Sequence, residues 1–148
     1  MRKVMIVEDE ELILQGIKNI VHWNELELQL VHMAHSGQEA LEMWKKEPVD
    51  IIITDIEMPE MSGLELLKKI RSEEELVRFI ILTGYDEFEY AREAIHLEVE
   101  NYILKPINEE ELEKQLKEAA AKLEELEKKK TETEVKAQEE PEAEEVEE

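Results

Sequence analysis

The chain has 148 residues, of which 42% are hydrophobic and 39% charged, and its formal net charge is −22. This length suits one globular domain, and the negative charge argues against direct binding to nucleic acid or anionic lipid, whose phosphates it would repel. The absence of cysteine excludes disulfides and thiolate metal sites, and without a membrane-spanning apolar run or a signal-peptide cleavage site we expect a cytoplasmic protein.

The first half of the chain alternates between strand-like and helix-like patterns. A short apolar run from Val4 to Val7 predicts a strand, and apolar residues at helical spacing from Leu12 to Ile20 predict the helix that follows. Leu28 to Ala34 indicates a second strand, and Ser36 suits the N-cap of the next helix. Val49 to Thr54 is almost continuously apolar and β-branched, which is typical of a strand buried on both faces.

The second half continues this alternation. Its predicted elements are, in chain order, a loop at 58–63, a helix carrying Leu64, Leu67 and Ile70, a strand at Phe79–Leu82, a helix at Asp86–Ile95, a strand at Asn101–Leu104 and a long helix from Asn108. Strands that alternate with helices through short connections predict an α/β fold, with a parallel sheet covered by helices on both faces. Right-handed crossovers leave few topologies, and we expect the doubly wound order 2-1-3-4-5.

The last helix carries a seam of apolar residues at steps of four and three, namely Leu112, Leu116, Ala119, Leu123 and Leu126. Such a seam suits packing on the chain's own sheet and also suits pairing with another subunit. Beyond Lys130 the seam stops, and the glutamate-rich composition without aromatic residues predicts disorder. We therefore expect one folded domain at residues 1–124 and a helix extension with a disordered acidic tail at residues 125–148.

Carboxylates gather where two of the predicted strands end. Glu8 and Asp9 follow the first strand and Asp55 follows the third, and ligands of such sheets bind at this reversal of strand order. Two like charges 4 Å apart repel by roughly 4 kcal/mol at an effective dielectric constant of 20. Because Mg²⁺ takes oxygen ligands and often shares them with a phosphate, the sequence predicts a magnesium site that receives a phosphoryl group.

The fourth and fifth strands end in complementary groups. Thr83 offers a hydroxyl to a phosphoryl oxygen, Gly84 leaves the approach open, and Lys105 supplies a compact positive charge. Each residue alone has an ordinary explanation as a cap, a turn residue or a surface charge. Their joint occurrence at four strand ends favours an aspartyl-phosphate site with Asp55 as the nucleophile.

Four segments carry a resemblance to a known family, namely VMIVEDEE, IIITDIEMPEMSG, IILTGYDEFEYAREAI and NYILKP. Through them the chain from about Lys3 to Leu123 resembles the response-regulator receiver domains of two-component systems. The resemblance implies a flavodoxin-like (βα)5 fold shared with chemotaxis receivers. It also implies a phosphorylation-switched signalling domain that promotes only its own phosphoryl transfer and dephosphorylation, and that is not otherwise an enzyme.

The resemblance implies roles for the acidic residues. Asp55 matches the phospho-acceptor, whose donor is the phosphohistidine of a sensor histidine kinase. Glu8 and Asp9 match the acidic pair that holds Mg²⁺, or Mn²⁺, together with Asp55 and the backbone carbonyl of Glu57. The acidic side chain of Glu57 stands beside this site and is expected to alter reaction rates, in a direction that the sequence does not give.

The resemblance also implies how the signal is read out. Thr83 and Tyr102 match a switch pair, in which the hydroxyl reorients and the ring moves inward on phosphorylation. Lys105 matches the family's lysine, and its bond to Pro106 is expected to be cis. The output surface is then expected on the fourth helix, fifth strand and fifth helix, and whether it serves dimerisation or binding of another protein stays open.

The segment from His22 to Leu26, with LTGYDEFEYAREAI, is similar to a receiver subgroup that usually precedes an arabinose-regulator-type helix-turn-helix domain. No such domain follows in this sequence, so the chain is expected to be a stand-alone relay or a shortened form of a longer regulator. Glu27 and Glu98 stand where the subgroup often has glycine.

Two other functions fit the same topology. A receiver-like scaffold that signals without phosphorylation would be indicated by a missing acid, threonine or lysine, and all are present. A flavodoxin-like FMN carrier would need a hydroxyl- or glycine-rich loop after the first strand. The loop here reads EDEE, which repels phosphate unless a metal intervenes.

Overall fold

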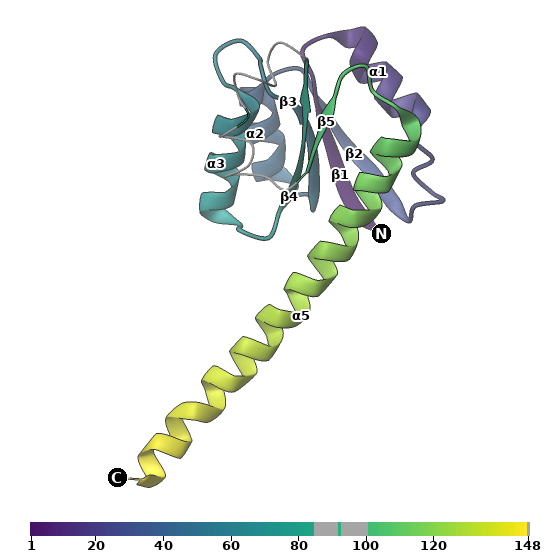
Figure 1. Ribbon diagram of the computed structural model, residues 1–148. Coiled ribbons are helices and arrows are strands. Elements are labelled where there is room, and N and C mark those ends of the chain that lie inside the picture. Colours follow the sequence, from purple (N-terminus) through teal and green to yellow (C-terminus); the bar gives the residue numbers. More distant parts are fainter. Residues whose placement is uncertain (85–91, 93–100, 148) are drawn as a thin grey trace.

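One parallel sheet forms the centre of the protein (Figure 1), and its strand order is β2-β1-β3-β4-β5. The computed structural model describes residues 1–84, 92 and 101–147, with side chains up to residue 135. The strands are β1 (Arg2–Val7), β2 (Leu28–Ala34), β3 (Ile51–Asp55), β4 (Arg78–Thr83) and β5 (Asn101–Leu104). The predicted doubly wound α/β fold and its strand order are confirmed.

Helices cover both faces of the sheet (Figure 1). They are α1 (Glu11–Ile20), α2 (Gly37–Lys46), α3 (Gly63–Glu73) and α5 (Glu109–Glu147). Because successive strand residues point to opposite faces, Met5 and Ile52 pack with α2 and α3, whereas Val4 and Ile53 pack with α1 and α5. Apart from Arg92, the helix predicted at Asp86–Ile95 lies outside the described residues, and so does Glu98.

Side-chain caps fix the beginnings of α2, α3 and α5; at α3 the Ser62 hydroxyl accepts a hydrogen bond from the backbone N–H of Glu65 at 3.1 Å. The Ser36 hydroxyl accepts a hydrogen bond from the backbone N–H of Glu39 at 3.1 Å, which confirms the predicted N-cap of α2. The Asn108 side chain accepts one from the backbone N–H of Glu111 at 3.0 Å at the start of α5. These bonds satisfy backbone donors that the first turn of a helix leaves without a partner.

Glu27 lies in the tight connection between α1 and β2, and its backbone φ is 58°. Side chains other than glycine are disfavoured in this left-handed region. Glu27 stands where the similar receivers often have glycine, and the backbone conformation at this position favours a residue without a Cβ.

The helix α5 has two different halves. In the first, the apolar seam packs on the chain's own sheet, since Leu112, Leu116, Ala119 and Leu123 are all buried. In the second, α5 projects away from the sheet (Figure 1) and continues to Glu147, where the composition predicts a disordered tail. Glutamate, lysine and alanine are strong helix formers, and ion pairs four residues apart, such as Lys129–Glu125 at 3.0 Å, support this half.

The division of the chain at residue 124 stays a prediction. The continuous α5 crosses that position without a break. Within the described ranges, no helix is both long and apolar enough to pass through a membrane.

Candidate functional site

The pairing of β1 with β3 brings acidic residues together at the carboxyl ends of the strands. Val7 lies opposite Thr54 in the sheet, so the residues that follow them, Glu8 and Asp55, lie side by side at the ends of the strands. Single carboxylate oxygens of Glu8, Asp9 and Asp55 all lie within 4.8 Å of one another. The predicted convergence of the three carboxylates is therefore present in the structure.

Glu8 occupies the least solvated position of this acidic cluster. Its side chain is fully buried, and neither of its oxygens has a hydrogen-bond donor among the described residues. Burial raises the pKa of Glu8 to about 8, and the neighbouring Asp55 carboxylate adds to this increase, while Lys105 opposes it. A buried carboxylate without hydrogen-bond donors is stabilised by binding a cation or a proton.

Lys105 reaches the acidic cluster from the turn that follows β5. Its ammonium nitrogen lies 3.3 Å from Asp55 Oδ2 and 3.8 Å from Glu8 Oε1. The peptide bond between Lys105 and Pro106 is cis, as the resemblance implies. One cation thus faces two of the three carboxylates, so the cluster keeps a net negative charge whenever all three are ionised.

Asp9 marks the open side of the cluster. It is exposed, and together with Glu57, Met58, Pro59 and Ser62 it lines an open hollow of about 430 Å³. Glu57 therefore lies beside the cluster, as expected from the sequence, whereas the metal-binding role of its backbone carbonyl stays a prediction. The hollow gives solvent and small molecules access to the acids from this side.

Thr83 and Tyr102 lie on the neighbouring strands β4 and β5. Thr83 is buried at the end of β4, where its hydroxyl donates to the backbone carbonyl of Gly84 at 3.2 Å. Tyr102 is partly buried in β5, opposite Ile81 of β4, and its ring packs against the core on the α2 and α3 face. Their proposed coupling as a switch pair stays a prediction.

Gly63, at the start of α3, positions Asp55 through its backbone. A Cβ at Gly63 would lie 2.3 Å from the backbone carbonyl oxygen of Asp55, a distance that real contacts do not allow. The Gly63 N–H also donates to the carbonyl of Ile56 at 2.8 Å. No role for Gly63 is predicted from the sequence. Its place directly after the N-cap Ser62 is the available signal, but the close approach itself depends on the tertiary fold.

The acidic cluster fits a hard divalent cation. All side-chain ligand atoms of Glu8, Asp9 and Asp55 are carboxylate oxygens, and the buried oxygens of Glu8 are available to a metal ion. Mg²⁺ prefers oxygen ligands and usually retains waters, for which the exposed side at Asp9 leaves space. These three residues could therefore hold the predicted ion.

Comparison with known proteins gives a consistent result. Residues 4–117 match the family model described as the response regulator receiver domain. The chain is 42% identical over 133 residues to the uncharacterized transcriptional regulatory protein YesN of Bacillus subtilis, covering 88% of this chain and 36% of that protein. It is 37% identical over 113 residues to the transcriptional regulatory protein HptR of Staphylococcus aureus, covering 76% of this chain and 44% of that protein.

Solved structures show the same similarity. The REC domain of AraT, a response regulator from Geobacillus stearothermophilus, is 40% identical, with a TM-score of 0.74 over 87% of this chain and 98% of that one. A two-component transcriptional regulator AraC from Clostridium phytofermentans is 29% identical, with a TM-score of 0.79 over 84% of this chain and 97% of that one. The chain thus matches these receiver structures over nearly their full length, but spans less than half of the two curated relatives.

Proposed function

This chain belongs to the response regulator receiver family, and on that premise we propose that Asp55 accepts a phosphoryl group from the phosphohistidine of a sensor histidine kinase. The observation that carries the proposal is the meeting of Glu8, Asp9, Asp55 and Lys105 at one end of the sheet. Receivers of this kind are signalling domains rather than conventional enzymes. Any catalysis is proposed to be limited to the chain's own phosphorylation and dephosphorylation.

The transfer uses Asp55 as the nucleophile. A carboxylate oxygen of Asp55 bonds to phosphorus while the bond from phosphorus to the donor imidazole nitrogen breaks, and the donor histidine is released. Mg²⁺, or Mn²⁺, held by Glu8, Asp9 and Asp55 with the Glu57 carbonyl, would supply positive charge to the phosphoryl oxygens. Lys105, 3.3 Å from Asp55, neutralises part of the remaining charge, and the Thr83 hydroxyl is proposed to donate to a phosphoryl oxygen.

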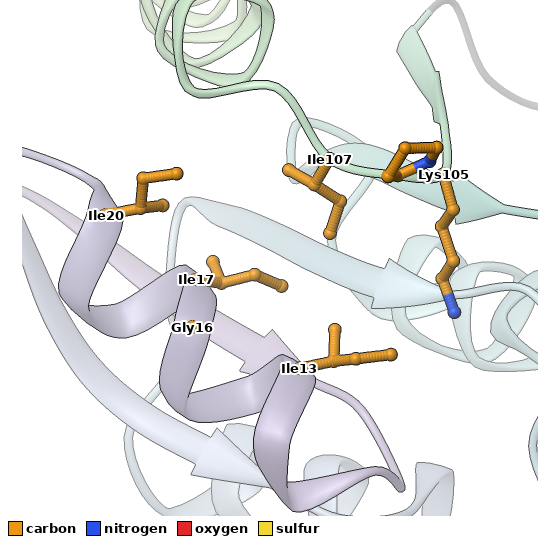
Figure 2. A pocket seen from close by; sticks show the side chains of 7 residues that line it. Ile13, Gly16, Ile17, Ile20, Lys105 and Ile107 are labelled. Atoms are coloured by element: carbon orange, nitrogen blue, oxygen red, sulfur yellow. The ribbon is translucent and has the colours of Figure 1, made fainter.

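A groove beside the site offers a surface for the kinase. It has a volume of about 310 Å³ and lies between α1 and the turn after β5 (Figure 2). Its lining residues are Ile13, Gly16, Ile17, Ile20, Lys105, Pro106 and Ile107. Because Lys105 both lines the groove and contacts Asp55, a protein seated in the groove would bring its phosphohistidine close to the acceptor.

Gly16 keeps this groove open. A Cβ built at Gly16 meets no other atom within 4 Å, so a side chain there would extend into unfilled space. A glycine inside a helix costs about 0.5–1 kcal/mol relative to alanine. Gly16 therefore lowers the stability of α1 while it leaves the groove open. This supports the use of the groove as a docking surface.

Phosphorylation is proposed to act through Thr83 and Tyr102 on the surface formed by residues 86–95, β5 and α5. Dimerisation and binding of another protein are the two uses proposed for that surface. The seam from Leu112 to Leu123 is buried against the chain's own sheet, so a dimer would have to use other residues of α5. Because the chain has a net charge of −22, we propose that it makes no direct contact with nucleic acid. We also propose a cytoplasmic location.

Mass spectrometry tests the acceptor. Incubation with acetyl phosphate and Mg²⁺ should add about 80 Da, the mass of one HPO₃ group, and Asp55→Asn should abolish the addition. Asp50→Asn is a matched control, because Asp50 precedes β3 at the opposite end of the sheet and accepts a hydrogen bond from the Lys3 backbone. An unchanged adduct in Asp55→Asn, or no adduct in the unaltered chain, would refute the proposal.

Kinase transfer tests the groove separately. Gly16→Leu should retain labelling by acetyl phosphate but lose transfer from a phosphorylated sensor histidine kinase. Lys18→Leu adds the same side chain to an exposed position of α1 and should retain both reactions. Normal kinase transfer to Gly16→Leu would remove the groove from the proposal without affecting Asp55.

The alternative function is a receiver-like scaffold that binds its partner without phosphorylation. It would be favoured by partner binding that is insensitive to Mg²⁺, to beryllofluoride and to Asp55→Asn. Size-exclusion chromatography with and without beryllofluoride and Mg²⁺ distinguishes the two functions, because only the switched receiver should change its association state or its partner binding.

A further inference from the structure

A second group of metal-binding side chains lies where the segment after α1 meets the first turn of α5. His22 Nδ1 lies 3.3 Å from Glu109 Oε1 and 3.0 Å from Glu113 Oε2. One ligand atom from each of the three residues lies within 4.8 Å of the other two. The backbone N–H of His22 donates to Glu113 Oε2 at 2.8 Å, which holds this carboxylate toward the imidazole.

The spacing of these atoms matches a tetrahedral ion. Zn²⁺ binds imidazole nitrogen at about 2.0–2.1 Å and carboxylate oxygen at about 2.0–2.2 Å, so neighbouring ligands of a tetrahedron lie roughly 3.3–3.5 Å apart. The 3.3 Å from His22 Nδ1 to Glu109 Oε1 falls in this range, whereas the 3.0 Å to Glu113 Oε2 is the length of a hydrogen bond, which a bound ion would replace. Glu109 and Glu113 are four residues apart on α5 and therefore present their carboxylates on one face of the helix.

We propose that His22, Glu109 and Glu113 form a binding site for a zinc-type transition-metal ion, distinct from the acidic cluster at Asp55. An imidazole ligand favours Zn²⁺, Cu²⁺ or Ni²⁺, whereas the all-oxygen cluster favours Mg²⁺. Two carboxylates balance the charge of a divalent ion. The partly exposed side chains leave a fourth position for water, as in an open site rather than a closed structural one.

A bound ion would connect two segments that are far apart in the sequence. His22 follows Ile20 of the groove by two residues, and Glu109 follows Ile107 by two residues. The ion would therefore link the two walls of the groove at one end and tie α5 to the segment after α1. The expected consequence is a zinc-dependent increase in melting temperature, because the ion binds only when both segments are folded together.

His35 provides a matched control within the same chain. It also has two glutamate neighbours, but Glu11 faces its Nε2 at 2.6 Å and Glu39 faces its Nδ1 at 3.6 Å. Because the two carboxylates face different ring nitrogens, one ion cannot use the imidazole and both acids together. His35 thus has the composition of the proposed site without its geometry.

Calorimetric titration with Zn²⁺, in millimolar Mg²⁺ to fill the magnesium site proposed at the acidic cluster, tests the proposal on the full chain. We expect saturable binding of one ion per chain. Since loss of even a second-shell partner commonly weakens a metal site about 10–100-fold, His22→Ala and Glu113→Gln should each weaken binding at least tenfold. His35→Ala and Asp55→Asn should bind as the unaltered chain does, and Zn²⁺ should raise their melting temperature equally.

Three results would overturn the site. They are the absence of saturable binding in the unaltered chain, retention of full affinity in His22→Ala, and an equal loss in His35→Ala, which would indicate adventitious binding by surface histidines. Melting curves without metal verify that each variant folds. If His22→Ala melts at a lower temperature than the unaltered chain, Glu109→Gln takes its place. Glu109→Gln is expected to lose at least tenfold in affinity for Zn²⁺ as well.

Discussion

The protein places carboxylates around a positive partner in two contrasting regions. At the strand ends, Glu8 and Asp55 are buried and share Lys105. At the junction of α1 and α5, Glu109 and Glu113 are partly exposed and share His22. The residue types are similar in the two regions, whereas their burial differs.

Burial decides the direction of the pKa shift in each region. It raises the pKa of Glu8 to about 8, despite the nearby ammonium group of Lys105. At the exposed junction, hydrogen bonds from the backbone and ring of His22 lower the pKa of Glu113. This contrast means that the buried region stores electrostatic repulsion, which a metal ion or a phosphoryl reaction can relieve, whereas in the exposed region hydrogen bonds from His22 favour the charged form of Glu113.

The largest expected effect concerns Glu8. Its pKa is about 8 in the folded chain, against an ordinary value of 4.5. The folded chain therefore holds the proton more tightly, and its stability without metal should fall as pH rises from about 4.5 to about 8, by on the order of 3 kcal/mol. Urea unfolding in EDTA at pH 5.5 and 8.5 should show this fall.

Glu8→Gln should lack most of this pH dependence, because glutamine cannot ionise. Its exposed neighbour Glu10 supplies the control: Glu10→Gln should lose as much stability as the unaltered chain when the pH rises. An identical pH dependence in Glu8→Gln and the unaltered chain would mean that burial of this carboxyl group does not set the contrast between the two regions.

A somewhat smaller effect is expected from Mg²⁺. Binding at a hundredfold excess over Kd should stabilise the fold by about 2.7 kcal/mol. Since Glu8 must release its proton to bind metal, the stabilisation should grow between pH 6 and pH 8. In thermal melts, Asp9→Asn should reduce it and His22→Ala should leave it unchanged. If His22→Ala reduced the stabilisation by Mg²⁺ and Asp9→Asn left it unchanged, the magnesium site would instead lie at the exposed junction.

The smallest effect concerns His22 in the absence of metal. Hydrogen bonding to Glu113 raises the pKa of His22, so its contribution to stability is fully present below its ordinary pKa of 6.5 and is lost as pH rises through the raised value. His22→Ala should therefore lower the melting temperature slightly at pH 5.5 and not at pH 9. The contrast with Glu8, whose neutral form is favoured, would weaken if the loss were equal at both pH values.

Much of the architecture could be predicted from the sequence. The strands at Leu28–Ala34 and Asn101–Leu104 have the predicted bounds, while β1 and β4 extend beyond the apolar runs that indicated them. Helix ends and strand ends follow local signals, such as the cap at Ser36. The disordered tail stays a prediction: α5 continues to Glu147, but composition alone does not distinguish a charged helix from a disordered segment.

Periodicity along the chain predicts the order of strands and helices, and hence that Glu8, Asp9, Asp55 and Lys105 reach one end of the sheet. Periodicity and chain order suffice for this, since parallel strands end on the same side. The packing of distant segments, by contrast, is what buries Glu8, what requires Gly63 to lack a side chain, and what brings His22 to Glu113, 91 residues away. Burial and pairing of this kind depend on how separate segments pack, and no local pattern encodes those distances.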